Sequence, residues 1–196
     1  KKFLFAALLI CGTLPSVAEE KPRYQDASLP VEERVEDLLR RMTLHEKVLQ
    51  LQNNSNSDIN AVESHYKEST GTMHEMSKTA KEAAELFKKL QHHLRTRTPW
   101  GIPALITVEG INGVLQDGCT IFPQAIAQGP LFNPDLVENA EAIGREAHVI
   151  GIRQLQCPVL DIARDSVGGV WKDFGEDPFL IGEMGTSFVR GSQRKA

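Results

Sequence analysis

Two apolar runs in the second half of the chain have the length and composition of buried strands. Residues 102–108 and 155–162 are nearly continuous in apolar side chains, a pattern typical of strands that are covered on both faces in a parallel sheet. Glu109 follows the first run, and Asp161 lies near the end of the second. Because ligands of parallel α/β folds bind at the carboxyl ends of the strands, these carboxylates are candidates for a binding site.

Helical periodicity flanks both runs. Thr43, followed three residues later by Glu46, is a capping-box signature and predicts a short helix. The polar stretch 53–58 has no periodicity and is predicted to be a loop. The alternation of strands and helices indicates an α/β fold with a parallel sheet and right-handed crossovers. Apolar side chains at helical spacing predict longer helices over about residues 30–41, 73–95, 133–150 and 177–188.

The overall composition is that of an ordinary folded protein and excludes some classes of partner. The chain has 196 residues, of which 41% are hydrophobic and 24% charged, and its formal net charge is −4. No stripe of Lys and Arg is interleaved with aromatic residues. Nucleic acid is therefore not expected as a partner, since it requires a basic surface.

The first residues have the features of a secretory signal peptide. Lys1 and Lys2 precede a short apolar stretch, and small residues before Ala18 fit a cleavage site after it. The apolar stretch is shorter than the roughly 20 residues that span a bilayer, so we expect no membrane anchor. The sequence thus predicts a signal peptide over residues 1–18, an extended leader over 19–29, and a secreted or periplasmic protein.

No pattern in the sequence points to a metal or a cofactor. The six histidines lack the i, i+4 pairing typical of helical zinc sites, and there is no Gly-rich phosphate loop and no serine elbow. After cleavage only Cys119 and Cys157 remain, so one disulfide is the maximum. Both lie in or beside apolar runs, which favours buried free thiols, although a bridge between them stays possible.

Several short motifs along the chain are typical of one enzyme family. They are Tyr24–Asp26, Val31–Val35, Leu38–Lys47, Gly101–Pro103, Gly118–Gln124, Pro158–Asp165 and Phe174–Pro178. In this order they resemble the motifs of the N-terminal domain of glycoside hydrolase family 3, the group of β-glucosidases and β-xylosidases. That resemblance implies a (β/α)8 TIM-type barrel, a fold that typically needs about 250 residues. The chain is shorter than that, so residues 30–196 are predicted to form an incomplete barrel of about three βα units after a leading helical segment.

The same resemblance implies that the catalytic groups of the family are absent from these 196 residues. Retaining glycosidases need two carboxyl groups about 5 to 5.5 Å apart, one as nucleophile and one as acid/base. In the family the nucleophilic Asp lies on a later barrel strand, the acid/base lies later still, and a Lys-His pair that holds sugar hydroxyls lies beyond the position of Ala196. No catalytic residue is therefore expected within this chain.

The resemblance does place part of the sugar site here. Glu109 lies where the family has a carboxylate that accepts hydrogen bonds from hydroxyls of the terminal sugar, and an ionised carboxylate has about four acceptor sites for that purpose. The alternative is that Glu109 only caps the following turn. Asn112 replaces a His of the family and keeps its hydrogen-bonding ability, so we count it as a candidate substrate contact.

One departure from the family concerns a cation of the sugar site. The Arg-Trp-Gly-Arg run of the family is replaced here by residues 166–169, and the position of its second Arg, which reaches the sugar, falls on Gly169. Glycine cannot replace a guanidinium. Arg164 and Lys172 are the nearest remaining cations, and Arg164 is the weaker third candidate for substrate binding.

Four further carboxylates near these motifs are predicted to be structural. Asp161 and Asp165 are expected to hold the end of the second strand, although Asp161 and Glu109 alone would also suggest an acid/base pair. Glu176 and Asp177 precede a predicted helix, where carboxylates satisfy free backbone N–H groups and face the positive end of the helix dipole.

Together these features predict a glycoside hydrolase that acts on the terminal residue of a β-linked glucoside or xyloside with a retaining mechanism. Its carbohydrate substrate is the only partner expected. The chain as given is predicted to be an inactive fragment. The alternatives are a non-catalytic sugar-binding remnant and a fragment that does not fold stably, since a partial barrel exposes sheet edges.

Overall fold

The protein is described here by a computed structural model that covers residues 21–75, 78–164 and 170–193. The chain forms two compact units, divided between Thr43 and Leu44. The predicted signal peptide, Asp165 and Gly169 lie outside the described residues. Within the described residues no helix is both long enough and apolar enough to cross a membrane.

The described residues of the first unit, 21–43, form a 3-10 turn and one helix. The turn η1 spans Arg23–Gln25, and α1 spans Val31–Arg41, which confirms the helix predicted over residues 30–41. Pro30 immediately precedes α1, where a fixed φ and a missing N–H are tolerated. Acidic residues occupy the first turn of α1 and basic residues the last, in the sense that complements the helix dipole.

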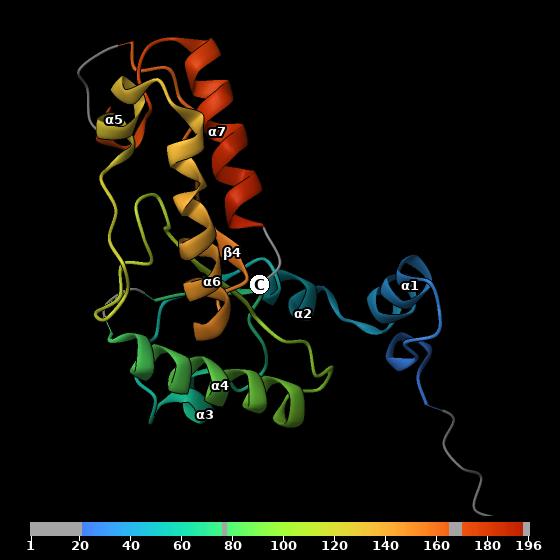
Figure 1. The fold of residues 1–196 in the computed structure, drawn as a ribbon. Coiled ribbons are helices and arrows are strands. Elements are labelled where there is room, and N and C mark those ends of the chain that lie inside the picture. Colours follow the sequence, from blue (N-terminus) through green and yellow to red (C-terminus); the bar gives the residue numbers. More distant parts are fainter. Residues whose placement is uncertain (1–20, 76–77, 165–169, 194–196) are drawn as a thin grey trace, which may run out of the picture. The chain divides into compact units, whose positions relative to one another are not determined.

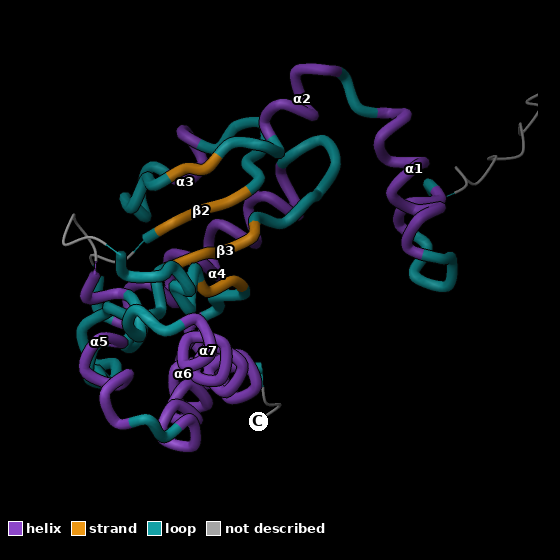
Figure 2. Tube along the Cα trace, turned by 90° about the horizontal axis from the view of Figure 1, so that it is seen from above, coloured by secondary structure: helices purple, strands orange, loops and turns teal. Residues whose placement is uncertain are grey.

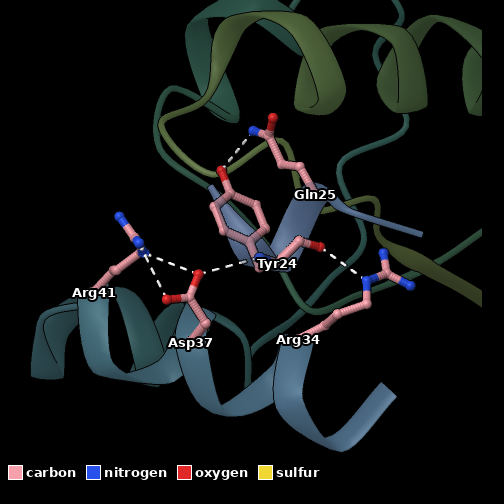
Figure 3. Close-up of polar contacts among 5 residues, drawn as sticks. All are labelled: Tyr24, Gln25, Arg34, Asp37 and Arg41. Atoms are coloured by element: carbon pink, nitrogen blue, oxygen red, sulfur yellow. Dashed lines mark hydrogen bonds and ion pairs between the residues drawn. The ribbon is translucent and has the colours of Figure 1, made fainter. Parts of the chain in front are cut away.

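Hydrogen bonds attach η1 to α1, as Figure 3 shows. The backbone N–H of Tyr24 donates to Asp37 Oδ2 at 3.1 Å, and Arg34 Nε donates to the carbonyl of Tyr24 at 3.0 Å. Arg41 donates to both carboxylate oxygens of Asp37, at 3.0 and 3.1 Å. These contacts lower the pKa of the Asp37 carboxyl, chiefly through the hydrogen bond from Arg41.

The second unit is built on a parallel sheet with the strand order β1-β2-β3-β4 (Figure 2). All three neighbouring pairs are parallel, which requires the crossover helices between the strands. The strands are Asn53–Asn54 (β1), Thr72–His74 (β2), Leu105–Val108 (β3) and Gln154–Leu155 (β4). The helices are Leu44–Leu49 (α2), Val62–His65 (α3), Ala80–Arg97 (α4), Ala125–Gln128 (α5), Ala140–Ile150 (α6) and Pro178–Ser192 (α7), with 3-10 turns at Gly129–Leu131 (η2), Pro134–Asn139 (η3) and Val170–Lys172 (η4).

The α/β fold class is confirmed, while individual strands differ from the expectation. β3 lies within the predicted strand 102–108. The predicted strand 155–162 is wrong beyond its first residue, because β4 ends at Leu155 and the chain continues without regular structure through a cis Cys157–Pro158 bond. β1 and β2 are two and three residues long and mostly polar, so no apolar run in the sequence predicted them. β2 also occupies the start of the predicted helix 73–95.

Helix α4 contributes a large part of the hydrophobic core. A complete capping box begins it, because Thr79 Oγ1 accepts from the N–H of Glu82 while the Glu82 carboxylate accepts from the N–H of Thr79. The apolar stripe predicted on this helix is buried, and β3 adds Ile106 and Val108 to the same core. The buried apolar residues of α4 are Ala83, Leu86, Phe87, Leu90 and Leu94.

Helices α6 and α7 lie side by side (Figure 1) and approach each other closely at Gly144. A Cβ atom added to Gly144 would lie 2.2 Å from the backbone oxygen of Ser192, the last residue of α7. No larger residue fits there unless the two helices separate. Gly182, on α7 itself, has no atom within 4 Å of the corresponding position.

We expect Gly144→Ala to lower the free energy of unfolding by roughly 1 to 3 kcal/mol, because the added methyl group forces the helix backbones apart. Gly182→Ala is the matched control, with an unchanged stability or a gain of up to about 1 kcal/mol from the higher helix propensity of alanine. Urea unfolding followed by circular dichroism measures both. Equal stability of the two variants would contradict the close contact of α6 and α7.

Candidate functional site

The predicted sugar-contact carboxylate lies at the carboxyl end of β3. Glu109 is the first residue after the strand and shares the strand face of Leu105 and Thr107, because side chains alternate along a strand. Lys172, at the end of η4, donates from Nζ to Glu109 Oε1 at 3.0 Å. The two side chains are 32% and 33% exposed for Glu109 and Lys172 respectively, so a ligand can reach both of them.

Little space separates Gly110, the residue after Glu109, from β4 and the segment that follows it. A Cβ atom on Gly110 would lie 2.8 Å from Leu155 Cδ2 and 3.2 Å from Cys157 Sγ. Burial raises the pKa of the Cys157 thiol to about 12, the charge of Glu109 adds to this rise, and a backbone hydrogen bond from Gly110 opposes it. The thiol is therefore neutral at physiological pH and is a packing group rather than a nucleophile. Cys119 and Cys157 are both free.

Asn112 is used within the loop that follows Glu109. Its Nδ2 donates to the carbonyl of Phe122 at 3.1 Å, and the N–H of Phe122 donates back to the carbonyl of Asn112 at 2.7 Å. Thr120 closes the same loop against α6, since its N–H and hydroxyl donate to the two carboxylate oxygens of Glu146 at 3.0 and 2.7 Å. The Asn112 amide nitrogen thus has a structural partner in this chain.

Asp161 and Arg164 are both exposed, on the irregular segment after β4. The sequence offered no reason to select Asp173, which is only 7% exposed and lies next to Lys172. Burial raises the pKa of the Asp173 carboxyl, and the negative charge of Asp161 raises it further. No strand end or helical spacing marks Asp173, because its burial comes from the folding of an irregular segment.

One of the two carboxylates before α7 caps that helix. Asp177 is the N-cap residue, and its Oδ1 accepts from the N–H of Phe179 at 2.9 Å. Pro178 occupies the first helical position, where it needs no N–H partner. Glu176 is exposed at the preceding position.

A cavity of about 630 Å³ lies away from this end of β3. It is lined by residues 103–105 at the amino end of the strand, by residues of α4 between Ala84 and Arg95, and by residues 149–151 and Arg153. Its cations are Lys88, Arg95 and Arg153. The predicted site residues do not line it.

Within the described part of the chain, no three His, Cys, Asp or Glu side chains are grouped so that they could hold a metal ion.

The arrangement at Glu109 suits a neutral, hydroxyl-rich ligand. Glu109 supplies acceptor oxygens and Lys172 supplies donors, and a hydroxyl group can satisfy either. Of the predicted substrate-binding residues, the structure places Glu109 at the strand end with a cationic partner, engages Asn112 in its loop, and leaves Arg164 exposed. Lys172 is the residue that the structure adds to Glu109.

Curated proteins with a similar sequence are glycosidases by name. A protein of Formosa agariphila assigned by name as a β-xylosidase is 31% identical over 98% of this chain and 28% of its own length. Beta-glucosidase C of Emericella nidulans is 28% identical over 88% of this chain and 31% of its own length. The chain therefore spans less than a third of the length of these relatives.

Solved structures of β-glucosidases are similar in fold. A β-glucosidase from Erythrobacter marinus is similar with a TM-score of 0.74 at 28% identity, over 87% of this chain and 24% of that one. The β-glucosidase of Listeria innocua in complex with glucose gives a TM-score of 0.66 at 29% identity, over 83% and 24% of the two chains. The family model described as the glycosyl hydrolase family 3 N terminal domain matches residues 43–196, and this chain belongs to that family.

Proposed function

We propose that this chain forms the first part of the sugar site of a secreted glycoside hydrolase that releases terminal β-linked glucose or xylose with retention of configuration. The nucleophile and the acid/base are contributed by residues outside these 196. The family membership and the β-xylosidase and β-glucosidase names of the relatives support the substrate class. The signal-peptide pattern of residues 1–18 supports export.

The observation that carries this proposal is the place of Glu109. It lies directly after the carboxyl end of a strand that is paired on both sides, which is where parallel α/β folds bind their ligands. One of its oxygens accepts from Lys172, and the remaining acceptor sites can serve hydroxyl groups. Its distance to the cation fits a charge-assisted pair, which keeps the carboxylate oriented.

The chain alone is expected to release no nitrophenol from 4-nitrophenyl β-glucoside or β-xyloside, because no group in it attacks the anomeric carbon. The measurement is absorbance over hours at high enzyme concentration, with a buffer blank. Turnover above the blank that disappears in Glu109→Gln would contradict the placement of the catalytic groups outside this chain.

Glucose and xylose are expected to bind weakly, and Glu109→Gln should reduce their affinity by about 10- to 100-fold. This range corresponds to a hydrogen bond to a charged group, about 1.5 to 3 kcal/mol. Titration followed by NMR chemical shifts measures the dissociation constants. Glu85→Gln, which changes an exposed carboxylate on α4, is the control and should bind as the unaltered chain does. Equal affinities of both variants would remove Glu109 from the sugar site.

Asp173 has no part in the proposed sugar cleavage. The raised pKa of its carboxyl predicts an effect on stability instead. The folded state favours the protonated carboxyl of Asp173. The stability that this preference contributes is fully present below the ordinary pKa of 3.8 and is lost as the pH rises through the higher pKa of the folded state. Asp173→Asn should therefore be more stable than the unaltered chain at neutral pH, by a margin that vanishes in acid.

Urea unfolding at a series of pH values measures this margin. Asp161→Asn is the companion variant, because removal of its charge lowers the folded pKa of Asp173 and should recover part of the stability. A margin that grows as the pH falls would show that the Asp173 carboxylate is stabilised in the fold.

A further inference from the structure

The ion pair between Glu109 and Lys172 joins two segments 63 residues apart at the carboxyl end of β3. The carboxylate directly follows β3, and the cation is the last residue of η4. We propose that Lys172 is a sugar-contacting residue, and that with Glu109 it clamps two neighbouring hydroxyl groups of the terminal sugar. This inference rests on the proposed function and adds a binding residue to the same site.

The donor and acceptor inventory of the pair fits two neighbouring hydroxyls. The ammonium group of Lys172 has three N–H donors and uses one of them on Glu109 Oε1 at 3.0 Å. Two donors remain, and the carboxylate keeps most of its roughly four acceptor sites. One hydroxyl can accept from Lys172 while its neighbour donates to Glu109, so a single ligand satisfies both charged groups.

The surroundings hold the pair at the strand end without closing it off. Glu109 continues from β3, and Lys172 is followed by Asp173 and Phe174, whose side chains are buried. About two thirds of each partner's side chain is covered, which weakens the competition from water and leaves a face open to a ligand. A fully exposed pair would be screened and would contribute little.

Lysine differs from the missing arginine in what it can recognise. A guanidinium donates in a planar fork and tends to occupy both oxygens of a carboxylate, whereas an ammonium is a compact charge on a flexible stem. The geometry here uses one oxygen of Glu109 and leaves the other for the ligand. The clamp is therefore selective for sugars that carry both hydroxyls of the pair.

The test is titration of the full chain with glucose and with the set of monodeoxyglucoses, followed by NMR chemical shifts. We expect Lys172→Met to weaken glucose binding by about tenfold or more, as for loss of a hydrogen bond to a charged group. Lys81→Met, which removes an exposed lysine on α4, is the control and should leave the affinity unchanged. Circular dichroism establishes that each variant is folded.

Two further comparisons separate a direct contact from an indirect one. When Lys172→Met is added to Glu109→Gln, glucose binding should weaken further, because the hydrogen bond from Lys172 to the sugar is lost. No further loss of affinity would mean that Lys172 only orients Glu109, and would overturn the inference. The monodeoxyglucose that lacks the hydroxyl bound by Lys172 should bind the unaltered chain more weakly than glucose does. This difference in affinity between the two sugars should shrink in Lys172→Met.

The outcomes distinguish this inference from the proposed function. If Glu109→Gln weakens binding and Lys172→Met does not, Lys172 is only a surface ion-pair partner, and the proposed function stands without the clamp. If neither variant weakens binding, or if the unaltered chain binds none of the sugars, both the clamp and the sugar site at Glu109 are wrong.

Discussion

The pairing of β3 on both of its sides is the constraint on which the candidate site depends. Three residues of β3 face β2 in parallel register, and its last two residues face β4. A slip of one residue would turn Glu109 to the opposite face of the sheet, since side chains alternate along a strand. Gly110 strengthens this register, because the side chains of Leu155 and Cys157 leave no room for a Cβ atom.

The loops at this end of the sheet are held mainly by polar side chains that bind the backbone. Asn112 bridges to Phe122, Glu146 accepts two hydrogen bonds from Thr120, and Asp177 caps α7. Such bonds satisfy loop backbone groups that no strand partner reaches. Most of the polar groups near the site are consequently structural, and the Glu109–Lys172 pair is the part best suited to a ligand.

The acidic and thiol groups at this end of the sheet have different surroundings, and these surroundings give them different roles. Glu109 has a cation at 3.0 Å, whereas Asp173 is buried near a second carboxylate and has a raised pKa. Burial keeps the Cys157 thiol protonated. A perturbed pKa therefore marks packing at Cys157 and Asp173, although perturbed values often mark functional sites.

The sequence by itself predicted the longer helices, the central strand β3 and the place of Glu109 directly after it, because each depends on a pattern that is readable over a few residues. Apolar residues at helical spacing predict a helix with one buried face. An apolar run predicts a buried strand, and the residue after that run, here Glu109, is then expected at the end of the strand. The family membership, shown by the match over residues 43–196, was likewise predicted from short motifs in order along the chain.

Only the tertiary structure decided the short strands and the partners of the site. β1 and β2 are too short and too polar to show a period. β2 becomes a strand because it pairs with β3, and β1 becomes a strand because it pairs with β2. The contact of Lys172 with Glu109 and the burial of Asp173 depend on where η4 and the residues directly after it lie in the folded chain. Long-range contacts of this kind have no local signature, because the chain between the two partners determines where they meet.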